Sequence, residues 1–201
     1  MTIHIYTIVE GHGEVNAVPV LLRRLAHEML ERWDVQVFPP HRVPKGRMLN
    51  TDALERAAKL GRRRIVERGG KGGVMLLLDA DNECPATRGR DLLIRLRDAV
   101  HDLPTSVVLA KREYEAWFLA AALSLRGHGR VRSTADAPPD PEAIAGAKEY
   151  LVRELLVAEA AYSETVDQPA FTAIMDFAQA SRCRSFQKLR SDLVRMTELL
   201  T

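Results

Sequence analysis

The chain has 201 residues, of which 46% are hydrophobic and 28% charged, with a formal net charge of +2 at pH 7. This composition predicts one globular domain with room for a small appended subdomain, and a charge so close to neutral neither demands nor excludes a nucleic-acid partner. Because no run approaches the ~20 apolar residues of a membrane span and residues 1–5 lack the features of a signal peptide, we expect a cytoplasmic protein with no membrane partner.

The first part of the chain predicts a strand, a helix and a second strand. Residues 3–9 are rich in β-branched side chains, which favour a strand, and the two glycines of Glu10-Gly11-His12-Gly13-Glu14 predict a tight turn after it. From there apolar residues recur three and four apart, the spacing of one helix face, up to about Arg32. Residues 34–38 predict a short second strand that two prolines end.

A basic loop and a further helix lead to the central strand of the prediction. Residues 41–50 carry three basic side chains and predict a solvated loop, and a helix then runs from residue 51 or 52 until Gly69-Gly70 ends it. Residues 72–78 are two glycines followed by five apolar side chains, a pattern typical of a strand covered on both faces in a parallel sheet.

A fourth strand, residues 106–110, follows another helix, so strands and helices alternate four times. This order predicts an α/β fold with a parallel four-stranded sheet flanked by helices. Residues 126–141 are polar and end in a proline-rich run, which indicates an exposed excursion or hinge. The chain after it predicts three helices: residues 141–159, 168–180 and 185–200. The predicted parts are an α/β core over residues 1–125, the segment 126–141, and a helical C-terminal region over residues 142–201 that packs on the core.

Acidic residues follow three of the four predicted strands. Glu10 follows the first strand, Asp79 and Asp81 close the third, and Glu113 or Glu115 follows the fourth. The carboxyl ends of parallel strands meet at one edge of the sheet, where open α/β sheets place their sites, so we expect these side chains to gather there. Residues two apart in an extended segment point the same way, so Asp79 and Asp81 would face one point.

A cluster of carboxylates favours a hard divalent cation. Four carboxylates repel one another unless a cation neutralises them, and Mg²⁺ or Mn²⁺ would also hold substrate phosphates and lower the pKa of a bound water. The structural alternative is that Asp79 caps the strand and Asp81 makes a turn. His12, beside Glu10, could assist proton transfer or lie exposed in its turn.

Two short motifs resemble a known nucleic-acid enzyme domain. Val9-Glu10-Gly11 closing the first strand and Asp79-Ala80-Asp81 closing a later one resemble the Toprim domain of topoisomerases, primases and the overcoming-lysogenization-defect nucleases. Glu14, four residues after Glu10, resembles the nuclease branch in particular. A topoisomerase would need its tyrosine in a separate domain and a primase a zinc module, which two cysteines cannot build, so the resemblance implies hydrolysis.

Other segments resemble a smaller family over nearly the full chain. Glu113-Tyr114-Glu115-Ala116-Trp117-Phe118-Leu119-Ala120, Tyr162-Ser163 and residues 182–186 resemble a bacterial Toprim-like family named domain of unknown function 4276 (DUF4276). The resemblances imply a Toprim-like, Rossmann-like fold and a metal-dependent, nuclease-like phosphodiesterase that acts on DNA or RNA with Mg²⁺ or Mn²⁺. They also imply a separate ATPase partner in a phage-defence setting. The sequence does not decide between a monomer and a homodimer.

The resemblance assigns a role to each candidate residue. The implied roles are Glu10 as metal ligand and general acid or base, Asp79 and Asp81 as metal ligands, Glu14 as ligand of a second metal, and Glu115 or Glu113 as a further ligand. Lys111 is near enough in sequence to stabilise charge at a leaving phosphate. Glu115 is favoured over Glu113 because it lies in the Glu-Ala-Trp segment that resembles the smaller family. A solvated lysine is the structural alternative for Lys111.

Two other functions compete with the nuclease. The chain could be a non-catalytic partner or assembly subunit of an ATPase-containing system, with the acids as a residual or structural cation site. It could also be a small-molecule phosphatase, because an apolar run followed by Asp-x-Asp resembles the first motif of haloacid-dehalogenase-type phosphatases. Glu83 stands where that family usually has Thr or Val, which weakens the phosphatase hypothesis.

Overall fold

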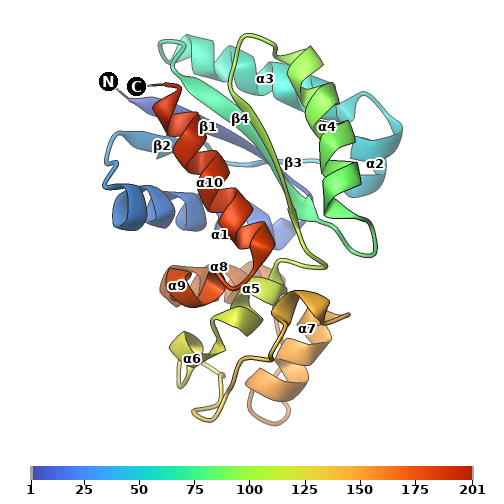
Figure 1. Cartoon of the computed structure of the whole chain (residues 1–201), viewed down its shortest axis with the longest axis vertical. Coiled ribbons are helices and arrows are strands. Elements are labelled where there is room, and N and C mark those ends of the chain that lie inside the picture. Colours follow the sequence, from blue (N-terminus) through green and yellow to red (C-terminus); the bar gives the residue numbers. More distant parts are fainter. Residues whose placement is uncertain (1, 201) are drawn as a thin grey trace.

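A parallel sheet forms the centre of the molecule, of which the computed structural model describes residues 2–200 (Figure 1). The strands are β1 (Ile3–Val9), β2 (Val35–Val37), β3 (His41–Arg42), β4 (Gly72–Asp79) and β5 (Thr105–Ala110). Their order is β2-β1-β4-β5, and β3 pairs with β1 beyond the end of β2. The pairings are parallel, as predicted, but the described sheet has five strands because His41 and Arg42 pair with the end of β1.

The helices that connect these strands agree with the sequence pattern except at one place. They are α1 (His12–Arg24), the π-helical turn η1 (Leu25–Met29), α2 (Lys45–Asn50), α3 (Ala53–Glu67) and α4 (Pro85–Ala99). The predicted loop over residues 41–50 is wrong, because it forms β3 and α2. Val43 and Met48 are buried in the core beneath α3, and this tertiary packing holds a helix of six residues that has no strong pattern of its own.

After β5 the chain forms short helices and one long one. They are α5 (Glu115–Ala120), α6 (Ala122–Leu125), η2 (Pro141–Ala143), α7 (Ala147–Tyr150), η3 (Leu151–Leu155), α8 (Glu164–Ile174), α9 (Phe177–Ala180) and α10 (Arg184–Glu198). The single helix predicted over residues 141–159 is broken, since Gly146 takes a left-handed φ of 65° before α7. In the described part of the chain no helix is both long and apolar enough to cross a membrane.

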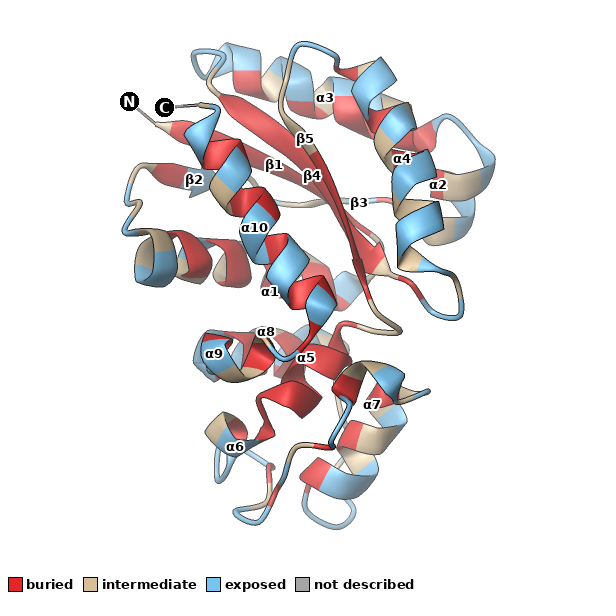
Figure 2. Ribbon diagram, viewed as in Figure 1, coloured by how far each residue is buried: buried red, intermediate tan, exposed pale blue. Residues whose placement is uncertain are grey.

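Side chains alternate between two cores, one on each face of the sheet. In β4, Met75 and Leu77 join the core beside α1, α5 and α10, whereas Leu76 and Leu78 join the core beside α3 and α4. Burying one such side chain contributes about 1.5–3 kcal/mol, so the buried lengths of β1 and β4 hold the centre together (Figure 2). Asp79 continues the series of Met75 and Leu77, which places it on the α1 and α5 face.

The C-terminal helices are packed onto the α/β part. Helix α8 runs along α1, and α10 returns to the sheet, where it packs against β5. The segment over residues 126–141, predicted as exposed, is mostly so, but Val131, Ala135 and Pro138 are buried. Val131 also forms an isolated bridge to Leu156. This segment is therefore held against its neighbours along part of its length.

Candidate functional site

The carboxyl edge of the sheet carries acidic side chains from four places in the chain. Glu10 follows β1, Glu14 lies in the first turn of α1, Asp79 ends β4, and Glu115 begins α5. Figure 1 shows this edge of the sheet facing the C-terminal helices, so the acids lie where the two parts meet. We call these four residues the carboxylate cluster.

Asp79 lies at the centre of the cluster. Its Oδ1 accepts the backbone N–H of Tyr114 at 2.8 Å, which ties the end of β4 to the start of α5. Burial raises the pKa of Asp79 well above its usual value, and the carboxylates of Glu115, Glu14 and Glu10 raise it further. The gathering of acids expected from the strand ends is therefore present for these side chains.

Gly11 leaves room for Glu14 to fold back over the start of α1, and Gly13 leaves room for Gln168 of α8. Burial raises the pKa of Glu14, while the backbone N–H groups of Glu14 and Gly11 lower it. A Cβ on Gly11 would lie 2.3 Å from Glu14 Oε2, and one on Gly13 would lie 2.0 Å from Gln168 Oε1. Glu14 thus caps the start of the helix and is also a member of the cluster. His12, between the two glycines, is exposed.

Glu115 is the most enclosed acid of the cluster and has a hydroxyl partner. Glu115 is only 2% exposed, and its Oε1 accepts a hydrogen bond from the Tyr162 hydroxyl at 2.9 Å. Burial raises the pKa of Glu115 to about 7, although the Tyr162 hydroxyl and the Lys148 ammonium group both favour the charged form. Tyr162, on the loop before α8, was quoted for the family resemblance but was not predicted as a site residue.

Glu113 has a different task from Glu115. Its Oε2 accepts the backbone N–H of Lys148 at 2.9 Å, which holds the start of α7 near the end of β5. The Lys148 side chain forms an ion pair with Glu164 on α8. Among the acids that raise the pKa of Asp79, Glu115 is present and Glu113 is not. Glu113 also raises the pKa of Glu115, so it borders the cluster, whereas Glu115, the favoured candidate, belongs to it.

Asp81 does not share the direction of Asp79, so that expectation is wrong. Residues two apart face the same way only in an extended backbone, but β4 ends at Asp79 and Asp81 has a left-handed φ of 49°. The Asp81 carboxylate pairs with the Lys45 ammonium group and is 56% exposed. Its charge still raises the pKa of Glu10, so Asp81 borders the cluster on the side of Glu10.

Lys45 is the residue at this edge that sequence reasoning missed. Its Nζ donates to the backbone oxygen of Asp79 at 2.8 Å and to Asp81 Oδ2 at 2.5 Å, and the side chain is only 14% exposed. Lys45 also lowers the pKa of Glu10. The basic run over residues 41–50 was the available signal, but only the pairing of β3 with β1 brings it to the carboxyl edge.

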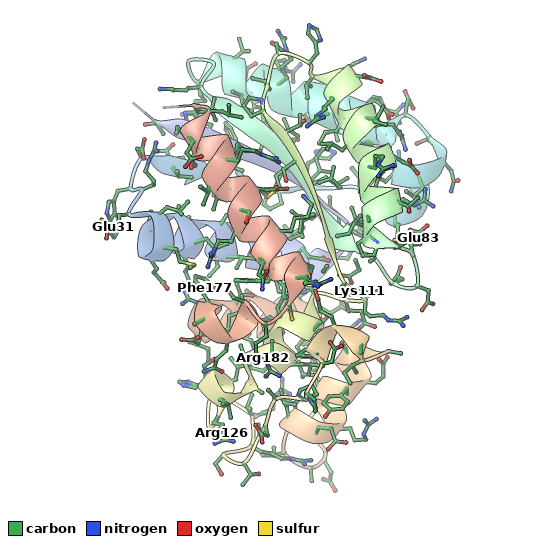
Figure 3. The ribbon with its side chains drawn as sticks, viewed as in Figure 1. Glu31, Glu83, Lys111, Arg126, Phe177 and Arg182 are labelled. Carbon is green, nitrogen blue, oxygen red and sulfur yellow. The ribbon has the colours of Figure 1, made fainter. Side chains whose placement is uncertain are left out.

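Lys111 belongs to another part of the surface. It lines a cavity together with Cys84 and Arg184. Hydrogen bonds from Thr87 are the main cause that lowers the pKa of the Cys84 thiol, and the charge of Lys111 adds a smaller contribution. Figure 3 shows Lys111 near the amino-terminal end of α10. Lys111 is not among the main charges that shift the pKa values of the cluster acids, which favours the alternative of a lysine outside the site.

Comparison with known protein families finds one family whose model matches most of the chain. The model of the family described as a domain of unknown function (DUF4276) matches residues 9–194. The chain belongs to the DUF4276 family. No curated protein and no solved structure matches the chain. The match covers the whole carboxylate cluster, so the cluster lies within the DUF4276 domain and not in an extension of it.

The carboxylates of this DUF4276 chain fit a cation that needs few protein ligands. Within residues 2–200, no three His, Cys, Asp or Glu side chains stand as a ready metal-holding group. Mg²⁺ keeps several of its waters and is usually held by one or two carboxylates with substrate phosphates, so it does not require such a group. Glu10 and Asp79 are partly accessible and can meet a hydrated ion, whereas Glu14 and Glu115 are buried.

Proposed function

We propose that the chain is a Mg²⁺- or Mn²⁺-dependent hydrolase that cleaves phosphodiester bonds in DNA or RNA at the carboxylate cluster. The observation that carries the proposal is the charge of the cluster. Four carboxylates meet at one edge of the sheet, and among the described residues none of the four forms an ion pair. Beyond the effect of burial, the other three raise the pKa of Asp79. Such repulsion opposes folding unless protonation or a cation removes it, and a divalent ion does so while the carboxylates stay charged.

Each residue has a defined task in this proposal. Glu10 and Asp79 would hold the ion together with water and a phosphate oxygen. Bound there, Mg²⁺ supplies the positive charge that polarises the phosphate and lowers the pKa of water. Glu10 is partly accessible and burial raises its pKa, which suits a group that takes a proton from the attacking water. Lys45 positions Asp81 and the end of β4 by its two hydrogen bonds.

The Toprim resemblance supports phosphodiester chemistry over other uses of a carboxylate cluster. The two strands that carry the resembling motifs, β1 and β4, are neighbours in the sheet, so Glu10 and Asp79 come from adjacent strand ends. We include in the proposal a Toprim-like relationship, a cytoplasmic setting and a separate ATPase partner, as the resemblance implies. Asp81 departs from the expected pattern because its carboxylate pairs with Lys45.

Cleavage assays with the purified chain test this proposal. Supercoiled plasmid, single-stranded DNA and single-stranded RNA are incubated with Mg²⁺, Mn²⁺ or EDTA. We expect metal-dependent cleavage that Glu10→Gln lowers about 100-fold or more, the usual range for loss of a general base. Asp79→Asn should also lower it, whereas Asp98→Asn, an exposed acid on α4, should not. Cleavage that survives both Glu10→Gln and Asp79→Asn would contradict the proposal.

A non-catalytic assembly subunit is the second candidate, and one observation favours it. Several acids already have structural partners: Glu14 the backbone at the start of α1, Glu113 the N–H of Lys148, and Glu115 the Tyr162 hydroxyl. On this hypothesis Mn²⁺ binds without any cleavage, and Asp79→Asn changes metal binding or partner binding alone. Hydrolysis of p-nitrophenyl phosphate but not of nucleic acid would point instead to a small-molecule phosphatase.

A further inference from the structure

One edge of the sheet is open and lies at the bottom of a groove. Strand β5 pairs with β4 and has no strand partner on its other side within residues 2–200. Helices α4 and α10 pack on either side of β5, and two cavities, of about 950 and 410 Å³, lie between them. Figure 1 shows β5, labelled in Figure 2, as the outer strand between these helices. We call this feature the β5 groove.

The backbone of β5 presents hydrogen-bonding groups to the groove. The bonds Val74 N–H to Pro104 O, at 3.0 Å, and Ala80 N–H to Ala110 O, at 2.9 Å, show that the even-numbered residues of this segment face β4. In a parallel ladder both backbone groups of one residue face the same side and successive residues alternate. Thr105, Val107 and Leu109 therefore face away from β4, and each of them lines one of the two cavities.

These outward groups are both unpaired and shielded. Val107 and Leu109 are only 2% and 3% exposed, so their outward N–H and C=O groups lie at the bottom of the groove and meet little bulk water. Buried backbone groups without partners are costly, and the usual partners in a sheet are those of another strand. Thr105–Ala110 contains no proline and no charged side chain, two of the common devices that block an edge strand.

The rim of the groove carries three basic side chains that form no ion pair in the described part of the chain. Within residues 2–200 the side chains of Arg90, Lys111 and Arg184 form no hydrogen bond or ion pair. The same cavity holds two acids that backbone N–H groups hold in place, since Asp140 caps η2 and Glu142 accepts the N–H groups of Arg184 and Ser185. Three unpaired cations thus face two carboxylates, which leaves a surplus of one positive charge. All three free cations lie at the carboxyl end of β5, so an occupant is expected to be acidic at that end.

We propose that the β5 groove binds an extended peptide of a partner protein, which adds to β5 as a further strand and places acidic side chains against Arg90, Lys111 and Arg184. Strand addition of this kind gains affinity from main-chain hydrogen bonds and specificity from side-chain contacts. A strand that matched β5 along its six residues would be about 20 Å long.

Two other occupants fit the groove less well. A nucleic-acid strand offers few donors to the outward carbonyls, and neither cavity is lined by a Phe, Tyr or Trp on which bases stack. A second copy of the chain could pair its own β5 antiparallel to this one. The amino-terminal end of β5 in that copy would then lie beside the three unpaired cations. That end carries Arg97 and Arg195 beside Asp98 and Asp192, so it offers no surplus of negative charge.

Binding of designed peptides to the full chain tests the proposal. The probe is a fluorescein-labelled peptide of alternating valine and threonine with two aspartates at one end, together with versions N-methylated at all the valines or at all the threonines. An added strand turns alternate N–H groups toward β5, so one N-methylated version should bind at least about tenfold more weakly than the other. Equal binding of both versions, or no binding of any version at millimolar peptide, would overturn the proposal.

Substitutions at the rim supply the matching protein controls. Arg90→Ala and Arg184→Ala should each weaken binding about two- to fivefold, the range of one exposed ion pair, and Lys59→Ala on α3 should not. Both arginines lie outside the carboxylate cluster, so metal-dependent cleavage should stay unchanged, which separates this test from that of the proposed function. Competition by a single-stranded oligonucleotide, or a dimer that Arg184→Ala dissociates, would overturn the proposal in favour of the other occupants.

Discussion

At the scale of single residues, the cluster holds carboxylates in surroundings that favour their neutral form. Burial raises the pKa of Glu115 to about 7 from an ordinary 4.5, and it also raises the pKa of Asp79 and Glu14. A carboxyl whose pKa is higher in the folded than in the unfolded chain stabilises the fold while it is protonated. That contribution is complete below the unfolded pKa and is lost as pH rises through the folded pKa, between about 4.5 and 7 for Glu115.

Glu115→Gln is therefore expected to reduce the pH dependence of stability. Glutamine keeps an oxygen for the Tyr162 hydroxyl but carries no charge at any pH. Between pH 4.5 and pH 8 the unmodified chain should lose up to about 3 kcal/mol from this one group, and the variant should not. Urea unfolding at both pH values in EDTA measures the difference, with Glu198→Gln, an exposed acid on α10, as control. Equal losses in the unmodified chain and in Glu115→Gln would contradict the assignment.

At the scale of elements, α3 lies unusually close to β1 because of one glycine. A Cβ on Gly61 would lie 2.3 Å from Cδ1 of Tyr6, a fully buried side chain of β1. This approach brings the backbone of α3 against the aromatic ring and closes the core on that face of the sheet. A glycine inside a helix of 15 residues costs stability by itself, so its presence here is explained by packing.

Gly61→Ala is expected to destabilise the chain even though alanine favours helices. Overpacking against Tyr6 costs about 1–3 kcal/mol, which the gain of up to about 1 kcal/mol in helix propensity offsets only in part. Gly46→Ala in α2 is the matched control, because a Cβ there meets nothing within 4 Å and should leave stability unchanged or raised. Thermal unfolding of both variants gives the comparison, and a Gly61→Ala chain more stable than Gly46→Ala would show that α3 can move away.

Helices and strands could be predicted where the local sequence carries a periodic or apolar pattern. They could not be predicted where contacts with residues distant in sequence decide the local structure. The five apolar residues of β4 and the spacing in α1 reveal a strand and a helix directly, and parallel topology then brings Glu10 and Asp79 to one edge. Helix α2 is fixed by contacts of Met48 with a core that the local sequence does not contain, so Lys45 was missed as a member of that edge. The direction of the Asp81 side chain depends on a left-handed φ, which Asp tolerates but which the local sequence does not predict.

At the scale of the whole molecule, the C-terminal helices and the sheet share one core. Helix α10 contributes Phe186, Leu189 and Leu193 to the core that α1 and β1 also line. A buried polar link accompanies this packing, since Ser106 Oγ on β5 donates to Asp192 Oδ2 on α10 at 2.5 Å. Residues far apart in sequence thus bury one another in a single core. We therefore expect the chain to unfold as one cooperative unit.

Unfolding followed by two probes tests this cooperativity. In a Trp33→Phe background, fluorescence reports Trp117, which is fully buried in α5, while far-UV circular dichroism reports all helices and strands. The two urea transitions should coincide. Asp192→Ala should shift both midpoints together by about 1–3 kcal/mol, because it leaves the buried Ser106 hydroxyl without its partner, whereas Asp98→Ala at the surface should change stability by less than about 0.5 kcal/mol. A Trp117 transition that moved alone would mean that the C-terminal region folds separately from the sheet.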